Sequence, residues 1–495
     1  MGQTVKKIIV EISRIILGAV FIFSGFVKAV DPMGSVYKIK DYLTAFDLSF
    51  FDFTALPIAF ILFAVEFAIG VCLLLGVFRR ANTIFALIFM IVMTPLTLYL
   101  AIKNPVTDCG CFGDAILLTN WATFYKNIPL LIMAIILFLW YKSITPVFTK
   151  KCDSLIAFWV YFFITGFALY CFSFLPILDF RPYKVGANIP ALMEIPENAE
   201  HPVFETKLIY AKNGVQRNFT IKDYPKNDSS WVFVDSKTIM VKKGYEPPIH
   251  GFSITTKEGN DITDQILSDS SYTFLLIAQK LEEASENNVD KINEIYDYSK
   301  KFGYDFYALT SSLPVEIKEW TKNTGAEYPF ATMDNITLKT IIRSNPGLLL
   351  LKGGTIINKW PNTALPKLSE VNTKLDNNDI GKIPKNSNVL KILIVSLIFL
   401  IPLCILFLYD FLVLRKRQKM RRMKRVYVEY MVPEPDMEEE RKESPAIEQT
   451  PIQENEETAK SENPPIQRKL KKSPKGKQKS TKPTNSKANR SDKQT

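Results

Sequence analysis

The chain of 495 residues is poor in the side chains that usually bind transition metals. Its two histidines, His201 and His250, stand far apart in the sequence. A zinc or iron site usually needs several imidazole or thiolate ligands, so we expect neither a transition-metal enzyme nor metal ligands of this kind. Cysteine is scarce as well: six residues in so long a chain do not make a disulfide scaffold.

Long apolar runs are plentiful. Hydrophobic residues make up 47% of the chain and charged residues 22%, which indicates membrane and soluble parts in one protein. A helix of about 20 apolar residues crosses the hydrocarbon core. Six such helices are expected, at about 8–27, 55–78, 81–102, 121–141, 155–178 and 389–414. The first is interpreted as a retained helix rather than a signal peptide, because Lys28-Ala29-Val30-Asp31 is a poor cleavage site.

The basic residues in the short connections predict the orientation. Arg79-Arg80, Lys142 with Lys150-Lys151, and the basic run 415–425 fall on one side if the N-terminus is cytoplasmic. Lys28, Lys38 and Lys40, assigned to the first outer loop, weaken the rule without overturning it. The loop around residue 110 and the segment 181–387 then face outward.

The outward segment reads as soluble. Residues 181–248 are expected to be a small β-rich region, and residues 249–372 an α/β domain. In the latter we expect a hairpin at 252–263, strands at 272–278, 305–310, 347–351 and 355–360, and helices at 289–302 and 315–324. This order resembles the thioredoxin fold, with Asn345-Pro346 where that family carries its cis-proline.

The resemblance implies a Cys-x-x-Cys motif after the strand 272–278, but the sequence there, residues 279–285, has no cysteine. None occurs from Pro182 to Leu403, so this domain cannot exchange thiols by itself. We expect it to bind or dock a partner; the alternative is a spacer with no ligand.

Residues 415–495, after the last apolar run, are predicted to be a disordered, charged cytoplasmic tail. The basic run 415–425 is expected to contact anionic lipid headgroups. Nucleic-acid binding by the Lys-rich residues 467–493 is disfavoured against a solvated or lipid-facing tail.

The strongest candidate for chemistry is a loop between two apolar stretches. It reads Asp108-Cys109-Gly110-Cys111-Phe112-Gly113-Asp114. A disulfide between residues two apart requires a bend, which Gly110 allows, and so small a ring should be easily reduced. The aspartates oppose thiolate formation, whereas Lys103 and Lys126 favour it. Three interpretations stay open: a redox-active pair, a static disulfide, or metal binding by two thiolates and two carboxylates.

Cys171, toward the outer end of the fifth apolar stretch, is a possible resolving thiol. Cys72, Cys152 and Cys404 are expected to be packing residues.

Charged residues inside membrane helices are costly and often functional. Arg14 and Glu66 are such residues. They are expected either to pair with each other or to handle protons beside a bound quinone. Gly18, Gly25 and Gly70 should allow close helix contact.

These residues resemble a known family. Arg14-Ile15-Ile16-Leu17-Gly18, Ser24-Gly25-Phe26-Val27-Lys28, Glu66 with Gly70, and Cys109-Gly110-Cys111-Phe112-Gly113 look like the DoxX/MauE superfamily of four-helix bacterial membrane proteins, over about residues 1–145. The whole layout is similar to DoxX-family membrane proteins of Bacteroidetes. The resemblance implies a multi-pass protein of the bacterial inner membrane with its large domain in the periplasm. It makes Arg14, Lys28 and Glu66 an intramembrane charge site.

MauE-type proteins are associated with maturation of methylamine dehydrogenase, a disulfide-rich periplasmic enzyme, and DoxD/DoxX members with thiosulfate:quinone oxidoreductase. The resemblance therefore implies thiol redox chemistry by Cys109 and Cys111, with an exported thiol protein as partner and quinone as a possible cofactor. The alternative is a non-enzymatic scaffold with a structural loop disulfide. A transporter that depends on Glu66 is a third, weaker hypothesis.

Overall fold

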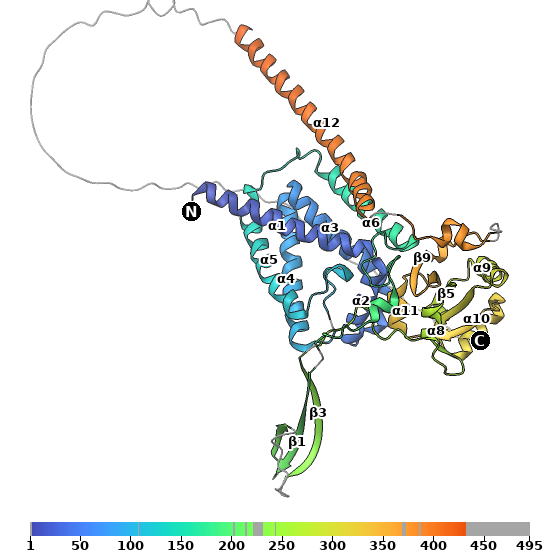
Figure 1. Cartoon of the computed structure of the whole chain (residues 1–495). Coiled ribbons are helices and arrows are strands. Elements are labelled where there is room, and N and C mark those ends of the chain that lie inside the picture. Colours follow the sequence, from blue (N-terminus) through green and yellow to red (C-terminus); the bar gives the residue numbers. More distant parts are fainter. Residues whose placement is uncertain are drawn as a thin grey trace, which may run out of the picture. The chain divides into compact units, whose positions relative to one another are not determined.

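The computed structural model describes residues 2–106, 108–200, 203–212, 215–220, 231–242, 244–368, 373–385 and 388–431. Within these residues six helices are long and apolar enough to cross a membrane. They are α1 (Gln3–Val30), α3 (Ala55–Leu75), α4 (Arg79–Lys103), α5 (Asn120–Leu139), α6 (Asp153–Phe174) and α12 (Asn388–Met431). Figure 1 shows α1, α3, α4 and α5 gathered into a bundle. The α-helical fold expected for this part is confirmed.

Glycines set the spacing between α1 and α3. A Cβ atom at Gly25 would lie 2.6 Å from the Phe67 amide nitrogen, and one at Gly70 would lie 2.6 Å from the Ile22 amide nitrogen. The two backbones can approach this closely only because these positions have no side chain. The predicted close contact is therefore confirmed, and it brings the end of α1 against the middle of α3.

A helix that the sequence analysis missed follows α1. Helix α2 (Pro32–Ala45) begins at Asp31, whose carboxylate accepts a hydrogen bond of 3.0 Å from the Gly34 amide. A carboxylate cap followed by proline is a favourable helix start. Lys28, expected in the first outer loop, lies in the last turn of α1 instead, whereas Lys38 and Lys40 do lie in the connection between α1 and α3, which is helical.

Helix α12 runs past its expected end. The membrane span expected at 389–414 lies within this helix, which continues through the basic run to Met431; the prediction of disorder was wrong for residues 415–431. Arginine, lysine and methionine are good helix formers, so a charged run can extend an apolar helix beyond the membrane. Residues 432–495, the rest of the predicted tail, lie outside the described residues.

The outer α/β domain is built on a six-stranded sheet in the order β4-β7-β6-β5-β8-β9. Its strands are β4 (Thr255–Thr256), β5 (Tyr272–Ala278), β6 (Asp305–Thr310), β7 (Phe330–Thr332), β8 (Gly347–Lys352) and β9 (Thr355–Pro361). Strands β5, β6 and β7 run parallel, and the β8–β9 hairpin runs antiparallel to β5. The Asn345-Pro346 bond before β8 is cis. The predicted thioredoxin-like order is confirmed.

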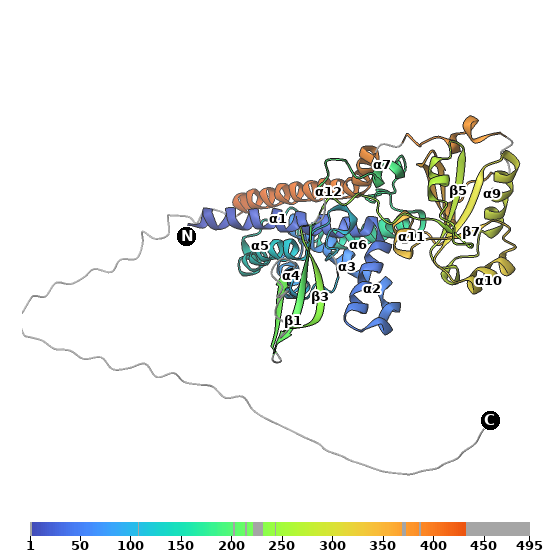
Figure 2. The same ribbon diagram turned by 60° about the horizontal axis from the view of Figure 1, so that its bottom comes forward.

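Helices cover both faces of this sheet. Side chains of α9 (Val289–Phe302) and α10 (Pro314–Thr324) form one core with the first face. Side chains of α7 (Ile189–Met193), α8 (Thr263–Ser268) and α11 (Asn335–Ile341) form a second core with the other face. Figure 2 shows α9 and α11 on opposite sides of β5 and β7. The expected hairpin at 252–263 is short: Thr255 bridges Asp261, and backbone hydrogen bonds join Thr256 to Asn260 and Ile262 to Ile254, while β4 pairs with β7 on its other side.

The β-rich region is a separate antiparallel sheet. Its order is β2-β1-β3, made of β1 (Val203–Lys212), β2 (Val215–Thr220) and β3 (Val232–Lys242). The strands fall within the segment where short strands were predicted.

Candidate functional site: a paired-cysteine loop above a buried ion pair

The cysteine loop connects α4 to α5 and turns tightly at two glycines. Gly110 has φ +64° and Gly113 has φ +51°, a left-handed conformation that residues with a side chain rarely adopt. A Cβ at Gly110 would also lie 2.8 Å from Cγ of Lys38. Glycine at 110 is therefore required both by the turn and by the approach of α2.

The two thiols lie side by side. Cys109 Sγ and Cys111 Sγ are 3.0 Å apart, and both residues are free cysteines here. Cys109 is buried against Leu100 and Val106, whereas Cys111 is partly exposed and lines a small cavity in the bundle. A small movement of the loop would close a bond between the two sulfurs.

Side chains from α1 and α2 hold the loop from two sides. The Tyr42 hydroxyl donates to the Cys109 carbonyl oxygen at 2.6 Å. Lys38 Nζ lies 2.9 Å from the carboxylate of Asp108, whose other oxygen accepts from the Gly110 amide. On the bundle side, Ser24 Oγ lies 2.8 Å from the Cys111 carbonyl oxygen. The loop backbone is thus fixed at both cysteines.

The surroundings make the two thiols unequal. A hydrogen bond from Cys109, together with the positive charges of Lys126 and Lys28, lowers the pKa of the Cys111 thiol to about 7 against the effect of burial. The same hydrogen bond and burial raise the pKa of Cys109. Lys126 Nζ also sits 4.0 Å from the ring centroid of Phe112. At neutral pH Cys111 is therefore the thiolate and the better leaving group of the pair.

A buried ion pair lies beneath Cys111. Lys28 Nζ is 2.7 Å from Glu66 Oε1 and 2.8 Å from Oε2. The two side chains are 7% and 2% exposed, so the charges compensate each other in an apolar surrounding. Ser24 Oγ lies 2.8 Å from Glu66 Oε2 and connects the pair to the loop. Lys28 and Glu66 line the same cavity as Cys111; its volume is about 40 Å³, enough for a water molecule.

Arg14 belongs to a different place. Its guanidinium pairs with Glu11 at 2.6 Å and donates to the Thr145 carbonyl oxygen at 2.7 Å. The expected Arg14–Glu66 pair was wrong. Fourteen residues of helix separate Arg14 from Lys28, which is about 21 Å along the axis, and Glu66 lies at the depth of Lys28.

The remaining cysteines lie outside the pair. Cys171 is buried near the end of α6, outside the apolar cluster around Cys109. Asp108 and Asp114, the carboxylates of the metal interpretation, each bond a cation. Over the described ranges, no three His, Cys, Asp or Glu side chains converge as ligands. The two carboxylates that the metal-binding interpretation requires are therefore already paired with Lys38 and Arg343.

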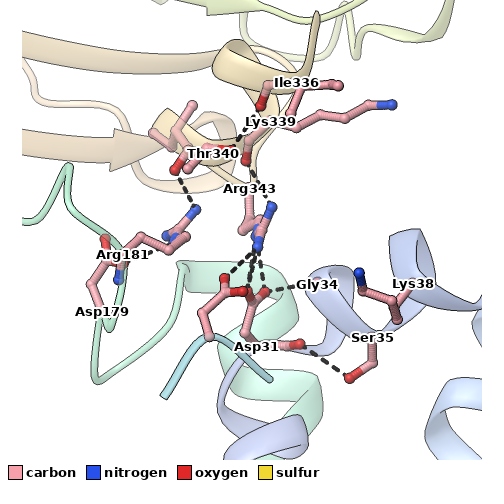
Figure 3. A network of polar contacts seen from close by, with 12 residues as sticks. Asp31, Gly34, Ser35, Lys38, Asp179, Arg181, Ile336, Lys339, Thr340 and Arg343 are labelled. Atoms are coloured by element: carbon pink, nitrogen blue, oxygen red, sulfur yellow. Dashed lines mark hydrogen bonds and ion pairs between the residues drawn. The ribbon is translucent and has the colours of Figure 1, made fainter. Parts of the chain in front are cut away.

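Arg343 of the outer domain contacts both the cysteine loop and the start of α2. Figure 3 shows its bonds to Asp31, the residue before α2. Arg343 Nη2 lies 2.7 Å from Asp31 Oδ2 and 3.0 Å from Asp114 Oδ2. Burial favours the neutral acid, but Arg343 and Arg181 outweigh it and hold the pKa of Asp31 below its usual value. For Asp114, burial outweighs Arg343 and raises the pKa. One guanidinium thus joins the start of α2, the cysteine loop and the outer domain.

A second contact uses the position of the missing Cys-x-x-Cys. The Tyr37 hydroxyl in α2 donates to Gln279 Oε1 at 3.0 Å, and Gln279 Nε2 donates to the Ile342 carbonyl oxygen. Asn345 Nδ2 donates to the Lys280 carbonyl oxygen. The segment after β5, where the thioredoxin fold carries its Cys-x-x-Cys motif, is therefore in contact here with the chain's own helix α2.

Sequence reasoning missed Lys38, Tyr42, Asp31 and Arg343. The signal for the first two was present: Lys38 and Tyr42 are four residues apart, so they share a face of any helix that begins at Asp31-Pro32. Arg343 offered no such signal, because its partners Asp31 and Asp114 lie far away in the sequence.

Comparisons with known proteins match separate segments of the chain. Residues 6–140 match the family described as methylamine utilisation protein MauE, and residues 204–243 match a domain of unknown function. No curated protein matches the chain in sequence.

Solved structures with similar folds include the thioredoxin domain of a thiol-disulfide oxidoreductase from Bacteroides vulgatus (13% identity, 22% of this chain and 81% of that chain, TM-score 0.19). Another is StoA from Bacillus subtilis (18% identity, 22% of this chain and 87% of that chain, TM-score 0.19). The thioredoxin-like assignment rests on the order and directions of the strands. The chain thus combines a MauE-like domain with a thioredoxin-like domain in a multi-pass membrane protein.

Proposed function

We propose that the protein is a membrane thiol–disulfide exchange component in which Cys109 and Cys111 oxidise an exported dithiol protein. The observation that carries the proposal is the sulfur pair 3.0 Å apart with unequal thiol pKa values. A static staple has no need of a thiolate stabilised by Lys126 and Lys28, whereas an exchange centre does.

The step follows from the inequality of the thiols. A partner thiolate attacks Cys109 of the Cys109–Cys111 disulfide and forms a mixed disulfide, and the bonding electron pair leaves on Cys111 as thiolate. The partner's second thiolate then attacks its own sulfur in the mixed disulfide and expels Cys109, which takes up a proton. The partner loses two electrons and the pair gains them. Cys111 is the leaving group because its pKa is about 7.

We further propose that a membrane quinone takes the two electrons and two protons back from the reduced pair. Cys111 opens on the cavity that also touches Glu66, Phe89 and Met93, so this sulfur faces the apolar interior of the bundle. A volume of about 40 Å³ holds a water and not a quinone ring, so the ring requires movement of Phe89 or Met93. Glu66, held by Lys28, is the group placed to receive a proton.

For orientation we propose the bacterial inner membrane, with the cysteine loop in the periplasm. Arg79, Arg80, Lys142 and Lys150 line one wide cavity at the end of the bundle where α3 and α5 finish, as the positive-inside rule expects of the cytoplasmic side. A cysteine introduced beside Leu117, which is 73% exposed, should react with an impermeant maleimide in whole spheroplasts. Protection there with labelling only after lysis would reverse the orientation.

Trapping tests the exchange itself. In a Cys111→Ala chain expressed in its own host, Cys109 runs the proposed step in reverse. Its thiolate attacks the disulfide of an oxidised partner molecule, forms a mixed disulfide and releases the partner's second thiolate. Without Cys111 to displace the partner, this mixed disulfide should accumulate and disappear on reduction. Cys109→Ala should trap much less, and Cys171→Ala should behave like the unmodified chain. If no variant yields a reducible adduct, and neither thiol changes redox state in cells, the proposal is wrong.

A scaffold is the second candidate, and the Arg343 contact favours it, because an arginine that joins three elements is an architectural feature. The double variant Cys109→Ala, Cys111→Ala separates the two. A scaffold keeps full complementation with this variant as long as it is inserted and folded. An exchange centre loses complementation.

A further inference from the structure

A second cavity lies away from the cysteine loop, where α6 ends and α12 begins. Its volume is about 330 Å³, and its wall includes the segment after α6 and the strand β9 of the outer domain. Trp159 Nε1 donates to the Phe399 carbonyl oxygen at 3.1 Å, and the Thr149 hydroxyl donates to Asp410 at 2.7 Å. These bonds hold α12 beside α6 and the segment before it. The cavity lies at the end of this helix pair, where α6 finishes and α12 starts.

Positively charged side chains dominate the wall of this cavity. Arg181, Lys184, Lys359 and Lys391 line the cavity, and Asp179 is the one carboxylate beside them. The side chains of Arg181 and Lys359 are 3% and 5% exposed, and both bond Asp179, at 2.8 Å and 3.0 Å. Arg181 also acts on Asp31 and Asp114, so the two buried cations face three carboxylates. Among the described residues no ion pair involves Lys184 or Lys391, and theirs is the positive charge that remains in this wall. Burial lowers the pKa of Lys359 to about 8 although Asp179 opposes the shift.

Hydrogen-bond donors are left over for a ligand. Lys391 Nζ donates to the Ile177 carbonyl oxygen at 3.2 Å, which uses one of its three protons. Lys359 Nζ bonds Asp179 and the Tyr183 carbonyl oxygen, which uses two. The side chain of Lys184 is exposed at the mouth. An anion with several oxygen atoms could accept from all three lysines.

The position selects the kind of anion. Phe174, the last residue of α6, is 47% exposed, and Ile383 at the mouth is 46% exposed. Both line the cavity together with the start of α12, so an apolar rim borders the basic interior at the depth where a membrane helix meets the headgroups. A free phosphate would leave this rim in contact with water, whereas a lipid covers it with acyl chain.

We propose that this cavity binds the phosphate headgroup of an anionic phospholipid, from the leaflet on the side of the cysteine loop. The lipid bridges α6, α12 and strand β9, and it holds the outer domain on the membrane helices. The site is independent of thiol chemistry: it contains no cysteine and does not share a residue with the cavity under Cys111.

The test uses the full-length chain, purified in a mild detergent and examined by native mass spectrometry. Dioleoylphosphatidylglycerol, dioleoylphosphatidylcholine and inorganic phosphate are added in separate samples. We expect phosphatidylglycerol to be retained at least about tenfold better than phosphatidylcholine, because the wall adds charge-assisted bonds to the anionic lipid only. The double variant Lys184→Gln, Lys391→Gln should lose that preference.

The matched control is Lys382→Gln, Lys385→Gln, which removes the same charge from exposed positions that do not line the cavity. It should retain phosphatidylglycerol as the unmodified chain does, and thermal unfolding shows that both doubles are folded. Equal retention of the two lipids, or a Lys184/Lys391 variant that keeps the preference, would overturn the proposal. Binding of inorganic phosphate without any preference between lipids would overturn the lipid and leave a soluble-anion site.

Discussion

Arg343 of the outer domain and Asp31 at the start of α2 are joined through both carboxylate oxygens: Nη2 lies 2.7 Å from Oδ2, and Nε lies 2.9 Å from Oδ2 and 3.1 Å from Oδ1. The same Nη2 reaches Asp114 of the cysteine loop at 3.0 Å. The thioredoxin-like domain is thus tied to the element that caps α2 and to the loop that carries the thiols. This relationship leads to the first of five predictions.

Replacing Arg343 should loosen the outer domain. Arg343→Gln removes the cation that bonds Asp31 and Asp114. The three side chains are 11%, 15% and 40% exposed, so the expected cost is below the about 3–5 kcal/mol of breaking a fully buried pair. We expect a clearly lower midpoint of thermal unfolding. We also expect faster proteolysis of the segments that join the outer domain to the membrane helices. Lys322→Gln, at an exposed position of α10, is the control. Unchanged unfolding and proteolysis would show that the guanidinium contributes little.

Alkylation should identify Cys111 as the thiolate. In the reduced protein we expect one cysteine to react with iodoacetamide with a midpoint near pH 7, and peptide mass spectrometry should place it at Cys111. Lys126→Gln removes a charge that lowers this pKa, so the midpoint should move to higher pH. Lys103→Gln should leave it in place, since Lys103 is not among the groups that shift Cys111. A first reaction at Cys109 would reverse the assigned roles.

Acid should weaken the attachment of the outer domain at Asp179. Burial favours its neutral form, but Lys359 and Arg181 outweigh burial and lower the pKa to about 2. A carboxylate with a lowered folded-state pKa stabilises the fold above its ordinary value near 4 and loses that contribution as the pH falls through the folded value. The contribution is about 2 kcal/mol. The free energy of unfolding, measured by tryptophan fluorescence from pH 5 to pH 2, should fall by this contribution. In Asp179→Asn the free energy of unfolding should depend less on pH over the same range.

Glycine at 110 should speed formation of the Cys109–Cys111 disulfide. Gly110→Ala forces a side chain into a left-handed backbone and against Cγ of Lys38, at an expected cost of about 1–3 kcal/mol in the loop. We expect slower closure of the Cys109–Cys111 bond, seen as thiols that stay open to maleimide after mild oxidation. Gly166→Ala in α6 is matched to it, because nothing lies within 4 Å of a Cβ there. Equal closure in both variants would contradict the role of the turn.

The Lys28–Glu66 pair can be tested for structure and for proton handling at once. Glu66→Gln leaves a buried lysine without its counter-ion and should destabilise the bundle. The double variant Lys28→Met, Glu66→Met should restore much of the stability, since two apolar side chains often replace a buried pair without loss. If the pair also moves protons, the double variant stays folded but reoxidises its thiols more slowly. Normal reoxidation in the folded double variant would make the pair purely structural.

Much of this architecture could be predicted because its signals are local. Apolar runs fix the first five membrane helices to within five residues at each end, and β5, β6 and α9 have the bounds that the sequence pattern indicated. The glycine contacts of α1 with α3 also followed from residue type alone.

The partner of Glu66 could not be predicted in this way. Arg14 and Lys28 are both on α1, and only the register of α1 against α3 decides which one meets the carboxylate. Helix α2 was missed because it is short and amphipathic: Val36 and Ile39 pack against Ala55 and Ala59 of α3, while its polar side contacts the cysteine loop and the outer domain. The long-range bonds of Arg343 have no counterpart in local sequence at all.

Ser24 stands between the two halves of the site with a single hydroxyl proton. Its oxygen is 2.8 Å from Glu66 and 2.8 Å from the Cys111 carbonyl, while Lys28 donates to it at 3.1 Å. One proton satisfies one acceptor at a time. The carboxylate of Glu66 and the carbonyl oxygen of Cys111 therefore compete for this proton. A change at either acceptor is felt at the other through Ser24, so the buried ion pair and the backbone of the cysteine loop are linked by one hydroxyl group.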